Sequence, residues 1–382
     1  MYLKFRRYKA VRLGFLLLFL LSCANNSTSD LMADADTFET LNLKWNKAYP
    51  DDNIQKSAIG LEWALSYCGA ILPNAPSGMS VGTEIITLNL EALGFTDPAL
   101  EKLYKLHQKI KSSPEYQANG SIDLGRYVTL LLGAPEHYYR IVGVPDKLDD
   151  LLSNYILLPE KGYVNHSGVS LEHRIIRFSE QKKLSQVFVS SEVDSVSGAV
   201  YEYETIEIIP NGQIRFGIFD ANGNRKNNAD ATHSNAGKPA KCMWCHESII
   251  QPLYNVQGNF PEFLTYLQLQ DKLTNYNQLL QNQKYALTTG VDFTQNQQHT
   301  LTELLYISFM EPSAERLALE WGLPLAQVQS LLSGLPTHTY HEFPFLGNLY
   351  DRNMIENLAP HNGLPVSSSV REASESEVNH IN

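Results

Sequence analysis

Two cysteines and a histidine stand together in the chain, in the order Cys242-Met243-Trp244-Cys245-His246. On one turn of helix, residues three positions apart lie on the same face, so both thiols would reach the two vinyl groups along one edge of a porphyrin. The histidine that follows directly would then bind the iron as its proximal ligand. This spacing indicates covalent attachment of one haem through Cys242 and Cys245, with His246 on the metal.

Other uses of the cysteine pair remain open. A zinc ribbon would need a second pair to complete four ligands, and the two remaining cysteines, Cys23 and Cys68, are far apart in sequence. A thioredoxin-type pair would follow a strand within a βαβ unit, whereas a polar, loop-like run (227–240) precedes this pair. A disulfide at this spacing would be strained. Zinc, redox-active thiols and cysteines without special chemistry are kept as alternatives to haem.

The segment from Cys242 to His246 resembles the haem-attachment motif of the c-type cytochromes, and the resemblance is confined to that motif. It implies one covalent haem c, bound by Cys242, Cys245 and His246. A weaker resemblance is to the β-sheet monohaem cytochromes that oxidise hydroxylamine, in which a Phe-Asp-x-x-Gly turn ends a strand before the haem motif. The run from Phe219 to Gly223 matches that turn, but no motif identifies the crosslinking lysine of that family here.

The first 22 residues have the pattern of an export signal. Basic residues precede an apolar run, Leu13 to Leu21, which is too short for a membrane-spanning helix. The run Leu20-Leu21-Ser22-Cys23 resembles a bacterial lipobox, which implies that Cys23 becomes the first residue of the mature protein and carries a lipid. By the same analogy, Ala24 implies the outer membrane rather than the inner one. The alternative is an ordinary secretory signal with an unrelated cysteine.

The export signal and the haem motif agree on one compartment. Haem c is attached outside the cytoplasm in bacteria, so we expect an outer-membrane lipoprotein that faces the periplasm. The net charge is −11, and the export segment is basic, so the remaining chain is more acidic still. This balance argues against nucleic acid or anionic lipid as a partner. The expected attachments are the membrane, through the N-terminal lipid, and a redox partner protein.

The sequence predicts an α+β fold whose regions follow one another along the chain. These are the signal peptide (1–22), the lipid anchor with a flexible tether (23–45), a helical region (46–160), an antiparallel sheet with the haem-attachment helix (161–250), a second helical region (251–364) and a loose tail (365–382). The tail is placed there because it is rich in Ser and Glu. Chemistry is therefore expected in the middle of the chain, between two helical regions.

Hydrophobic periodicity carries these assignments. An apolar stripe from Ile54 to Leu72 predicts the first helix, with Cys68 as a buried small hydrophobe on it. Helices are also predicted at 97–110, 123–132, 135–142, from Pro261 onwards and at 301–309. Period-two alternation predicts strands at 171–178, 184–189, 199–209 and 213–219, the last two joined by an Asn-Gly hairpin.

The stretch from Leu317 to Leu332 resembles the helix-turn-helix of DNA-binding proteins. An acidic protein that is exported from the cytoplasm would meet no DNA, so nucleic acid is not expected as a partner. We therefore expect this stretch to be a plain αα-corner.

The second axial position of the iron would decide the function. An electron carrier fills it with a Met thioether or another imidazole, whereas an enzyme or a gas sensor leaves it open. Met310, at a helix end before Pro312, is the preferred thioether, and Met354 is the second. The imidazole candidates are His233, His299, His338, His341 and His361. The alternative role of each methionine is core packing, and that of each histidine is an ordinary surface side chain.

Three classes of function follow. The preferred one is a membrane-anchored monohaem c-type cytochrome that transfers electrons outside the cytoplasm. The second is a haem c oxidoreductase or sensor with an open iron site, acting on a small nitrogen species or a peroxide. The third is a structural lipoprotein without haem. The helical regions on both sides of the haem motif exceed what a simple electron carrier needs, and they imply a further task.

Overall fold

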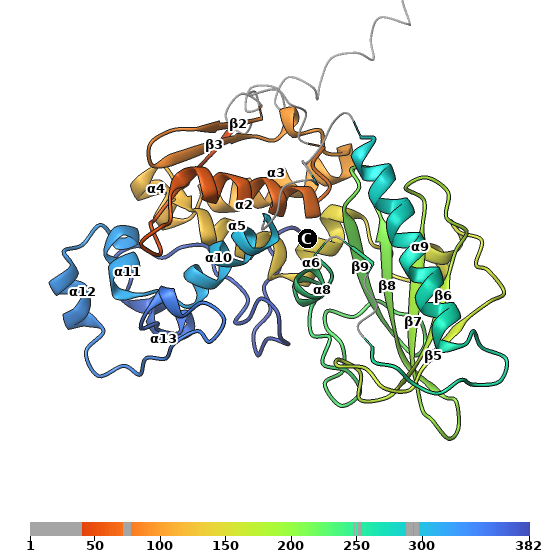
Figure 1. Cartoon of the computed structure of the whole chain (residues 1–382). Helices are drawn as coiled ribbons and strands as arrows, with labels where there is room; N and C mark the ends of the chain where they lie inside the picture. Colours follow the sequence, from red (N-terminus) through yellow and green to blue (C-terminus); the bar gives the residue numbers. More distant parts are fainter. Residues whose placement is uncertain (1–39, 72–77, 248, 251–253, 288–292, 294–297) are drawn as a thin grey trace, which may run out of the picture. The chain divides into compact units, whose positions relative to one another are not determined.

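The computed structural model describes residues 40–71, 78–247, 249–250, 254–287, 293 and 298–382. Within these ranges the chain forms twelve α-helices and two β-sheets of four and five strands (Figure 1), which confirms the predicted α+β class. The export signal, Cys23 and most of the predicted tether lie outside the described residues. None of the helices in the described ranges combines the length and the apolar character needed to cross a bilayer.

A small sheet begins the described chain. Its strands are β1 (Thr40–Lys44), β2 (Met79–Val81), β3 (Ile85–Asn89) and β4 (Ile122–Asp123), in the order β2-β3-β1-β4. Strand β1 pairs antiparallel with β3 and parallel with β4, and alternate residues of β1 and β3 are buried. The sequence did not predict this sheet, because its strands are too short for a clear period-two signal among neighbouring helices.

The helices of the N-terminal region are α2 (Ile54–Tyr67), α3 (Asp97–Lys111), α4 (Pro114–Asn119), α5 (Leu124–Leu132), α6 (Pro135–Val142) and α7 (Leu148–Leu152), with a 3-10 turn η1 (Glu91–Leu93). The predicted helices at 97–110, 123–132 and 135–142 are confirmed. From much later in the chain, α10 (Gln298–Met310) packs against α2 and α5. The approach is close because Gly60 and Gly125 lack side chains: an added Cβ would lie 2.7 Å and 2.5 Å, respectively, from carbonyl oxygens of α10.

The second sheet confirms the predicted antiparallel region. Its strands are β5 (Gly162–Val164), β6 (His173–Phe178), β7 (Val187–Val193), β8 (Val200–Ile208) and β9 (Ile214–Asp220). They follow one another in the sheet in chain order, and every neighbouring pair is antiparallel. Such a meander needs only short connections, which is why local alternation was enough to predict it.

The turn between β8 and β9 differs from the predicted Asn-Gly hairpin. Gly212 has a positive φ of 86°, but Asn211 is not among the residues with positive φ. The Asn211 amide instead donates hydrogen bonds to the carbonyl oxygens of Ser66 and Ala70, 2.8 and 2.7 Å away, at the end of α2. This asparagine therefore joins the turn to the N-terminal helices.

Helix α9 (Tyr266–Tyr285) runs along the five-stranded sheet (Figure 1), and its Tyr276 ring lies 5.7 Å from the Phe178 ring of β6. The predicted start at Pro261 is wrong. Thr265 caps the helix through a capping box with Gln268, in which each side chain bonds the other's backbone N–H. This local signal outweighs the helix-opening preference of proline.

The remaining elements lie near the C-terminus. Helices α11 (Ala314–Trp321), α12 (Leu325–Leu331) and α13 (Arg352–Ile355) are accompanied by 3-10 turns η2 (Pro344–Leu346) and η3 (Glu356–Leu358). The first two form the expected αα-corner, with Gly322 left-handed at the turn. The expectation of a loose tail is wrong: Val370 and Ile381 are buried, and the segment bonds to several elements of the body.

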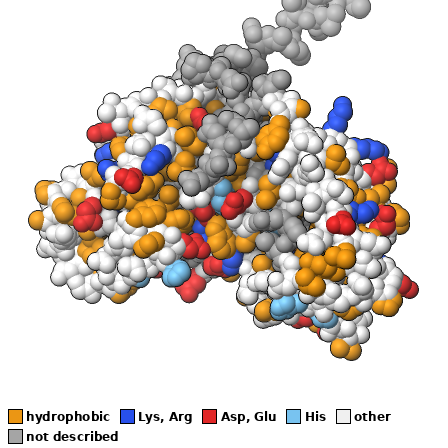
Figure 2. Space-filling view, in the orientation of Figure 1, with side chains coloured by type: hydrophobic (Ala, Val, Ile, Leu, Met, Phe, Trp, Pro, Cys, Tyr) orange, Lys and Arg blue, Asp and Glu red, His pale blue; other side chains and the backbone are white. Residues whose placement is uncertain are grey.

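Charged, polar and hydrophobic side chains are interspersed over the described part of the face in Figure 2. Large apolar side chains that stand exposed, such as Ile156, Val196 and Leu267, come from different parts of the chain. Single exposed apolar side chains are normal on a surface in water. The composition of this surface therefore does not point to a function.

Candidate haem site

The predicted attachment motif forms helix α8 (Pro239–His246), which packs against strand β9 (Figure 1). Pro239 occupies the first turn, where its missing N–H costs nothing and its fixed φ favours the helix. The helix ends directly after the motif, because Glu247 adopts the left-handed conformation with φ of 45°. The motif thus lies on a single short helix, as its spacing predicted.

Cys242 and His246 face one cavity between α8 and the five-stranded sheet. They are four residues apart and therefore lie on the same side of the helix. The cavity has a volume of about 120 Å³. Its large apolar lining side chains are those of Val164, Ile176, Phe188, Ile206, Phe216, Ile250 and Leu273. An apolar wall of this kind suits a porphyrin face, although a porphyrin is larger than the cavity and would be enclosed only in part.

The imidazole of His246 is available as a ligand. Its ring lies 5.8 Å from the Phe216 ring, and its Nδ1 atom is buried without a hydrogen-bond partner among the described residues. Burial lowers the pKa of His246 to about 4, against a hydrogen bond to the Ile249 backbone that raises it and with a smaller lowering contribution from the Arg174 guanidinium. The ring is therefore neutral at pH 7, which is the form that binds a metal.

The two thiols of the motif have different surroundings: Cys242 lines the cavity, whereas Cys245 does not and lies near Lys241 and Arg371. No disulfide joins the cysteines in the described ranges. Burial raises the pKa of Cys242 well above its ordinary value, and it also raises that of Cys245. A redox-active pair would show the opposite shift, because its thiolate is stabilised by positive surroundings. Cys68 is buried in the core on the end of α2, as predicted.

Polar side chains from three strands form another wall of the cavity. Arg174 on β6 pairs with Glu192 at 2.5 Å and with Glu204 at 3.2 Å. Two hydroxyl oxygens of lining residues, Ser190 Oγ and Tyr254 Oη, are buried without a hydrogen-bond partner among the described residues. Buried polar atoms are rarely left unpaired in proteins, and a water molecule in the cavity would satisfy these two hydroxyls.

The sequence did not single out these polar residues, although one signal was present. Arg174, Ser190 and Glu204 each stand two residues from an apolar lining residue of the same strand, Ile176, Phe188 and Ile206, and residues two apart lie on one face of a strand. The sheet register places Ser190 directly opposite Glu204. Polar residues on an otherwise apolar strand face can thus mark a site, but their proximity depends on a register that the sequence does not fix.

The structure does not bring Met310 to this cavity. Its side chain is buried at the end of α10 and lines a different hollow of about 410 Å³, together with Tyr306 and Val370. The preferred thioether ligand therefore stands apart from Cys242 and His246. Met310 as an axial ligand stays a prediction, and the structure places its side chain in a hollow that does not include Cys242 or His246.

The other axial candidates also have different surroundings. His299 bonds to the Tyr67 hydroxyl at 3.2 Å, and His338 pairs with Glu311 at 2.7 Å. His233 stacks on Tyr201 at 3.9 Å. The side chains of His341, Met354 and His361 are exposed. Among the described residues that line the cavity, His246 is the histidine and none is a methionine.

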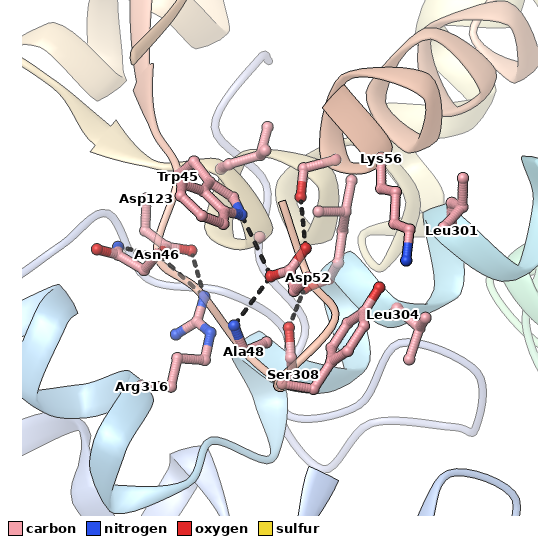
Figure 3. A pocket seen from close by; sticks show the side chains of 15 residues that line it. Trp45, Asn46, Ala48, Asp52, Lys56, Asp123, Leu301, Leu304, Ser308 and Arg316 are labelled. Atoms are coloured by element: carbon pink, nitrogen blue, oxygen red, sulfur yellow. Dashed lines mark hydrogen bonds and ion pairs between the residues drawn. The ribbon is translucent and has the colours of Figure 1, made fainter. Parts of the chain in front are cut away.

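A smaller hollow near α11 is lined by polar side chains that hydrogen-bond to one another (Figure 3). Its volume is about 20 Å³, which is room for one water molecule. Asp52 accepts hydrogen bonds from Trp45 Nε1 and the Ala48 amide, at 3.2 and 2.9 Å. Beside it, Arg316 binds both carboxylate oxygens of Asp123 at 2.9 Å. These groups satisfy one another and join α11 to strand β4.

The residues between 40 and 382 that the structure describes contain no cluster of three or more His, Cys, Asp or Glu side chains suited to a metal ion. Comparisons with protein-family models, with curated protein sequences and with solved structures found no match to this chain. What the site can do therefore follows from its own residues.

Proposed function

We propose that this chain is an exported, lipid-anchored protein that carries one covalent haem c and exchanges electrons outside the cytoplasm. Cys242 and Cys245 would hold the haem through thioethers, and His246 would bind the iron. The observation that carries the proposal is the placement of Cys242 and His246 on one cavity, where the imidazole is neutral and its Nδ1 lacks a partner among the described residues. A lipid on Cys23 would hold the protein at the outer membrane, and a redox partner protein would exchange electrons with it.

When bound, haem c supplies a reversible one-electron couple at its iron. The residues of the chain provide the surroundings. Phe188 and Phe216 contribute buried aromatic rings to the wall of the cavity. Arg174 is held between Glu192 and Glu204, so a buried positive charge stays paired. An apolar wall with paired, fixed charges would limit reorganisation when an electron arrives.

Removal of the attachment cysteines tests the proposal. We expect Cys242→Ala or Cys245→Ala to abolish haem staining on a denaturing gel after export from a host competent in cytochrome maturation. Cys68→Ala is the matched control, since this buried cysteine is not part of the motif, and it should retain the stain. Staining that persists in both motif variants, or a wild-type preparation without colour, would reject covalent haem and leave a structural lipoprotein.

A second candidate is a haem c oxidoreductase or sensor whose iron keeps one position open for a small nitrogen species or a peroxide. The polar wall of the cavity favours it, because the hydroxyls of Ser190 and Tyr254 would donate hydrogen bonds to a small bound molecule. Carbon monoxide added to the reduced protein, or cyanide added to the oxidised protein, separates the two candidates. A rapid spectral change means an open site, whereas an unchanged spectrum favours the electron carrier.

The variant Met310→Leu makes that comparison sharper. If the thioether were an axial ligand, its loss would convert a low-spin spectrum into a high-spin spectrum that responds to carbon monoxide. Because Met310 lines a different hollow from His246, we expect the spectrum of this variant to equal that of the wild type. A changed spectrum would show that the helices rearrange when haem is attached.

A further inference from the structure

The last residues of the chain, 366–382, belong to no helix or strand, yet they are ordered by contacts. Ser367, Val370 and Ile381 are almost completely buried. The segment folds back on itself, since the Ser368 amide donates to the Ser376 carbonyl oxygen at 3.1 Å and the Ser367 hydroxyl donates to Glu377 at 2.8 Å. We name residues 366–382 the C-terminal strap.

The strap encloses the ammonium group of Lys238, the residue that precedes α8. Lys238 has no exposed surface. Its Nζ donates to the carbonyl oxygens of Ser369 and Gly133, at 2.9 and 3.0 Å, and it pairs with Glu377 at 2.6 Å. The Ser374 hydroxyl is a further partner at 2.5 Å. Most of these partners come from the strap, so the start of α8 depends on the strap for its buried charge.

Backbone contacts bring the two segments even closer. The Lys238 amide donates to the Arg371 carbonyl oxygen at 2.7 Å. A Cβ on Gly237 would collide with that same oxygen, and Gly237 has a left-handed φ of 64°. Only glycine fits here without strain, because it both adopts this φ and leaves room for the strap.

The guanidinium group of Arg371 packs on the proposed haem motif. It lies 4.7 Å from the centre of the ring of Trp244, the residue that stands between Cys242 and Cys245 in the sequence. Its Nε donates to the Tyr306 hydroxyl at 2.8 Å, and a terminal nitrogen pairs with Glu303 on α10. Arg371 thus links Trp244 on α8 to α10 through the strap. A cation held against an aromatic face by a buried carboxylate is a strong restraint.

The strap and the cavity hold different side chains of α8. Lys241 and Trp244, three residues apart on the helix, contact the strap, and Lys241 pairs with Glu372 at 2.6 Å. Lys238 precedes the helix as its N-cap residue and is also held by the strap. Cys242 and His246 line the cavity. A rotation of the helix by one position, about 100°, would take His246 out of the cavity and would break the contacts of Lys238 and Arg371.

We infer that the C-terminal strap is part of the haem site, because through Lys238 and Arg371 it fixes the rotation of α8 and so positions Cys242 and His246 at the cavity. Lys238 and Arg371 are positioning residues, since neither lines the cavity. The inference rests on the proposed function for the identity of the ligand. The contacts between the strap and the helix stand independently of it.

Hydrogen exchange of the α8 amides, measured on the full chain made with and without haem, tests this inference. The informative variants are Arg371→Gln and Lys238→Met, with Arg371→Lys as the conservative rescue. Arg126→Gln is the matched control: Arg126 is also a buried arginine over an aromatic ring, but its ion-pair partners are Glu115 and Glu356. We expect α8 to exchange about tenfold faster or more in Arg371→Gln and Lys238→Met, but not in Arg126→Gln.

The haem spectrum separates positioning from simple stabilisation. In the haem-loaded variants we expect covalent staining to persist while the absorption bands shift, with Arg371→Lys close to the wild type. Unchanged exchange in α8 would overturn the inference. Faster exchange with an unchanged spectrum would also overturn it, because the strap would then act on stability alone. If the wild-type chain never acquires haem but Arg371→Gln and Lys238→Met still exchange faster than it does, the proposed function is rejected. The strap's hold on α8 remains supported in that case.

Discussion

Three buried histidines have a lowered pKa, and their surroundings distinguish them. Burial lowers the pKa of His107 to about 3 and those of His137 and His246 to about 4. His107 bonds to the Tyr127 hydroxyl, and His137 bonds to a carbonyl oxygen of α5. Of the three, His246 alone lines the haem cavity. A lowered pKa therefore marks burial, and it is the cavity together with the neighbouring cysteines that makes His246 the proposed ligand.

His107 makes stability depend on pH in a predictable direction. The native state keeps this imidazole neutral down to about pH 3, whereas the unfolded chain takes up a proton near pH 6.5. The unfolded state therefore binds more protons between these values, and stability is lost as pH falls through that window. For a complete titration this amounts to on the order of 4 kcal/mol.

The variant His107→Gln isolates this contribution, because glutamine does not titrate. We expect the wild type to be more stable at pH 7, and the difference in unfolding free energy to shrink as the pH is lowered to 4. Urea unfolding at a series of pH values measures the difference. The exposed His361→Gln provides the baseline. A difference that stays constant over this range would show that the pKa of His107 is the same in the folded and the unfolded protein.

At the scale of residues, the sequence predicted what depends on local spacing and missed what depends on the fold. Cys242 and His246 share a helix face because they are four positions apart, so their proximity was predictable. Arg174 and Glu204 meet only through the register of three strands. Met310 was chosen for its chain position, and long-range packing directs it to another hollow.

Among the elements, α11 is held to the N-terminal sheet by a buried ion pair. Arg316 and Asp123 are nearly inaccessible to solvent and form two hydrogen bonds of 2.9 Å (Figure 3). Asp123 also caps α5 by accepting from the Arg126 amide. The Asp123 carboxylate thus connects strand β4, the start of α5 and helix α11. Removal of its partner Arg316 is therefore expected to lower the stability of the fold.

We expect Arg316→Met to destabilise the protein by about 3–5 kcal/mol, because Asp123 would be left buried without its cation, while Glu320 would keep only its pairing with Arg352. The urea midpoint measures the loss. Arg140→Gln is the control, since Arg140 is an exposed helix residue paired with Glu136, and it should cost less than about 1 kcal/mol. Adding Asp123→Asn to Arg316→Met should recover part of the loss; no recovery would mean that the pair does not carry the energy.

The predicted elements succeeded where a local signal was strong. Helix α6 starts and ends at the predicted residues, because Pro135 opens it and Gly143 closes it in the left-handed conformation. The start of α9 was missed because a capping box at Thr265 competes with Pro261. The strap was misjudged because its composition is polar, while its order comes from partners elsewhere in the chain.

Across the whole molecule, regions that follow one another in sequence share one hydrophobic core. The same cluster of buried side chains contains Leu41 of β1, Val187 of β7 and Phe309 of α10. A smaller second core lies under α11 and α12, around Leu317 and Val328. The sequence predicted the regions but not this sharing, because periodicity shows which face of a helix is buried and not which element buries it.

The proposed membrane anchor is a property of the whole protein and has its own test. We expect Cys23→Ala to abolish incorporation of labelled palmitate and to move the protein from the membrane fraction to the soluble periplasmic fraction. Cys68→Ala is again the control and should stay in the membrane fraction. Because haem attachment needs export but no lipid, Cys23→Ala should still stain for haem if it is exported. Unaltered membrane association would show that another part of the chain binds the membrane.

The strap has a consequence for the order of biogenesis. Synthesis runs from the N-terminus, so α8 is complete long before residues 366–382 exist. During that interval the motif is without its cover, and both cysteines remain within reach of an attachment enzyme. Arrival of the final segment then encloses Lys238 and covers Trp244. A chain truncated after residue 365 would therefore keep the proposed thioether sites, Cys242 and Cys245, while Lys238 and Trp244 would lack their contacts with the strap.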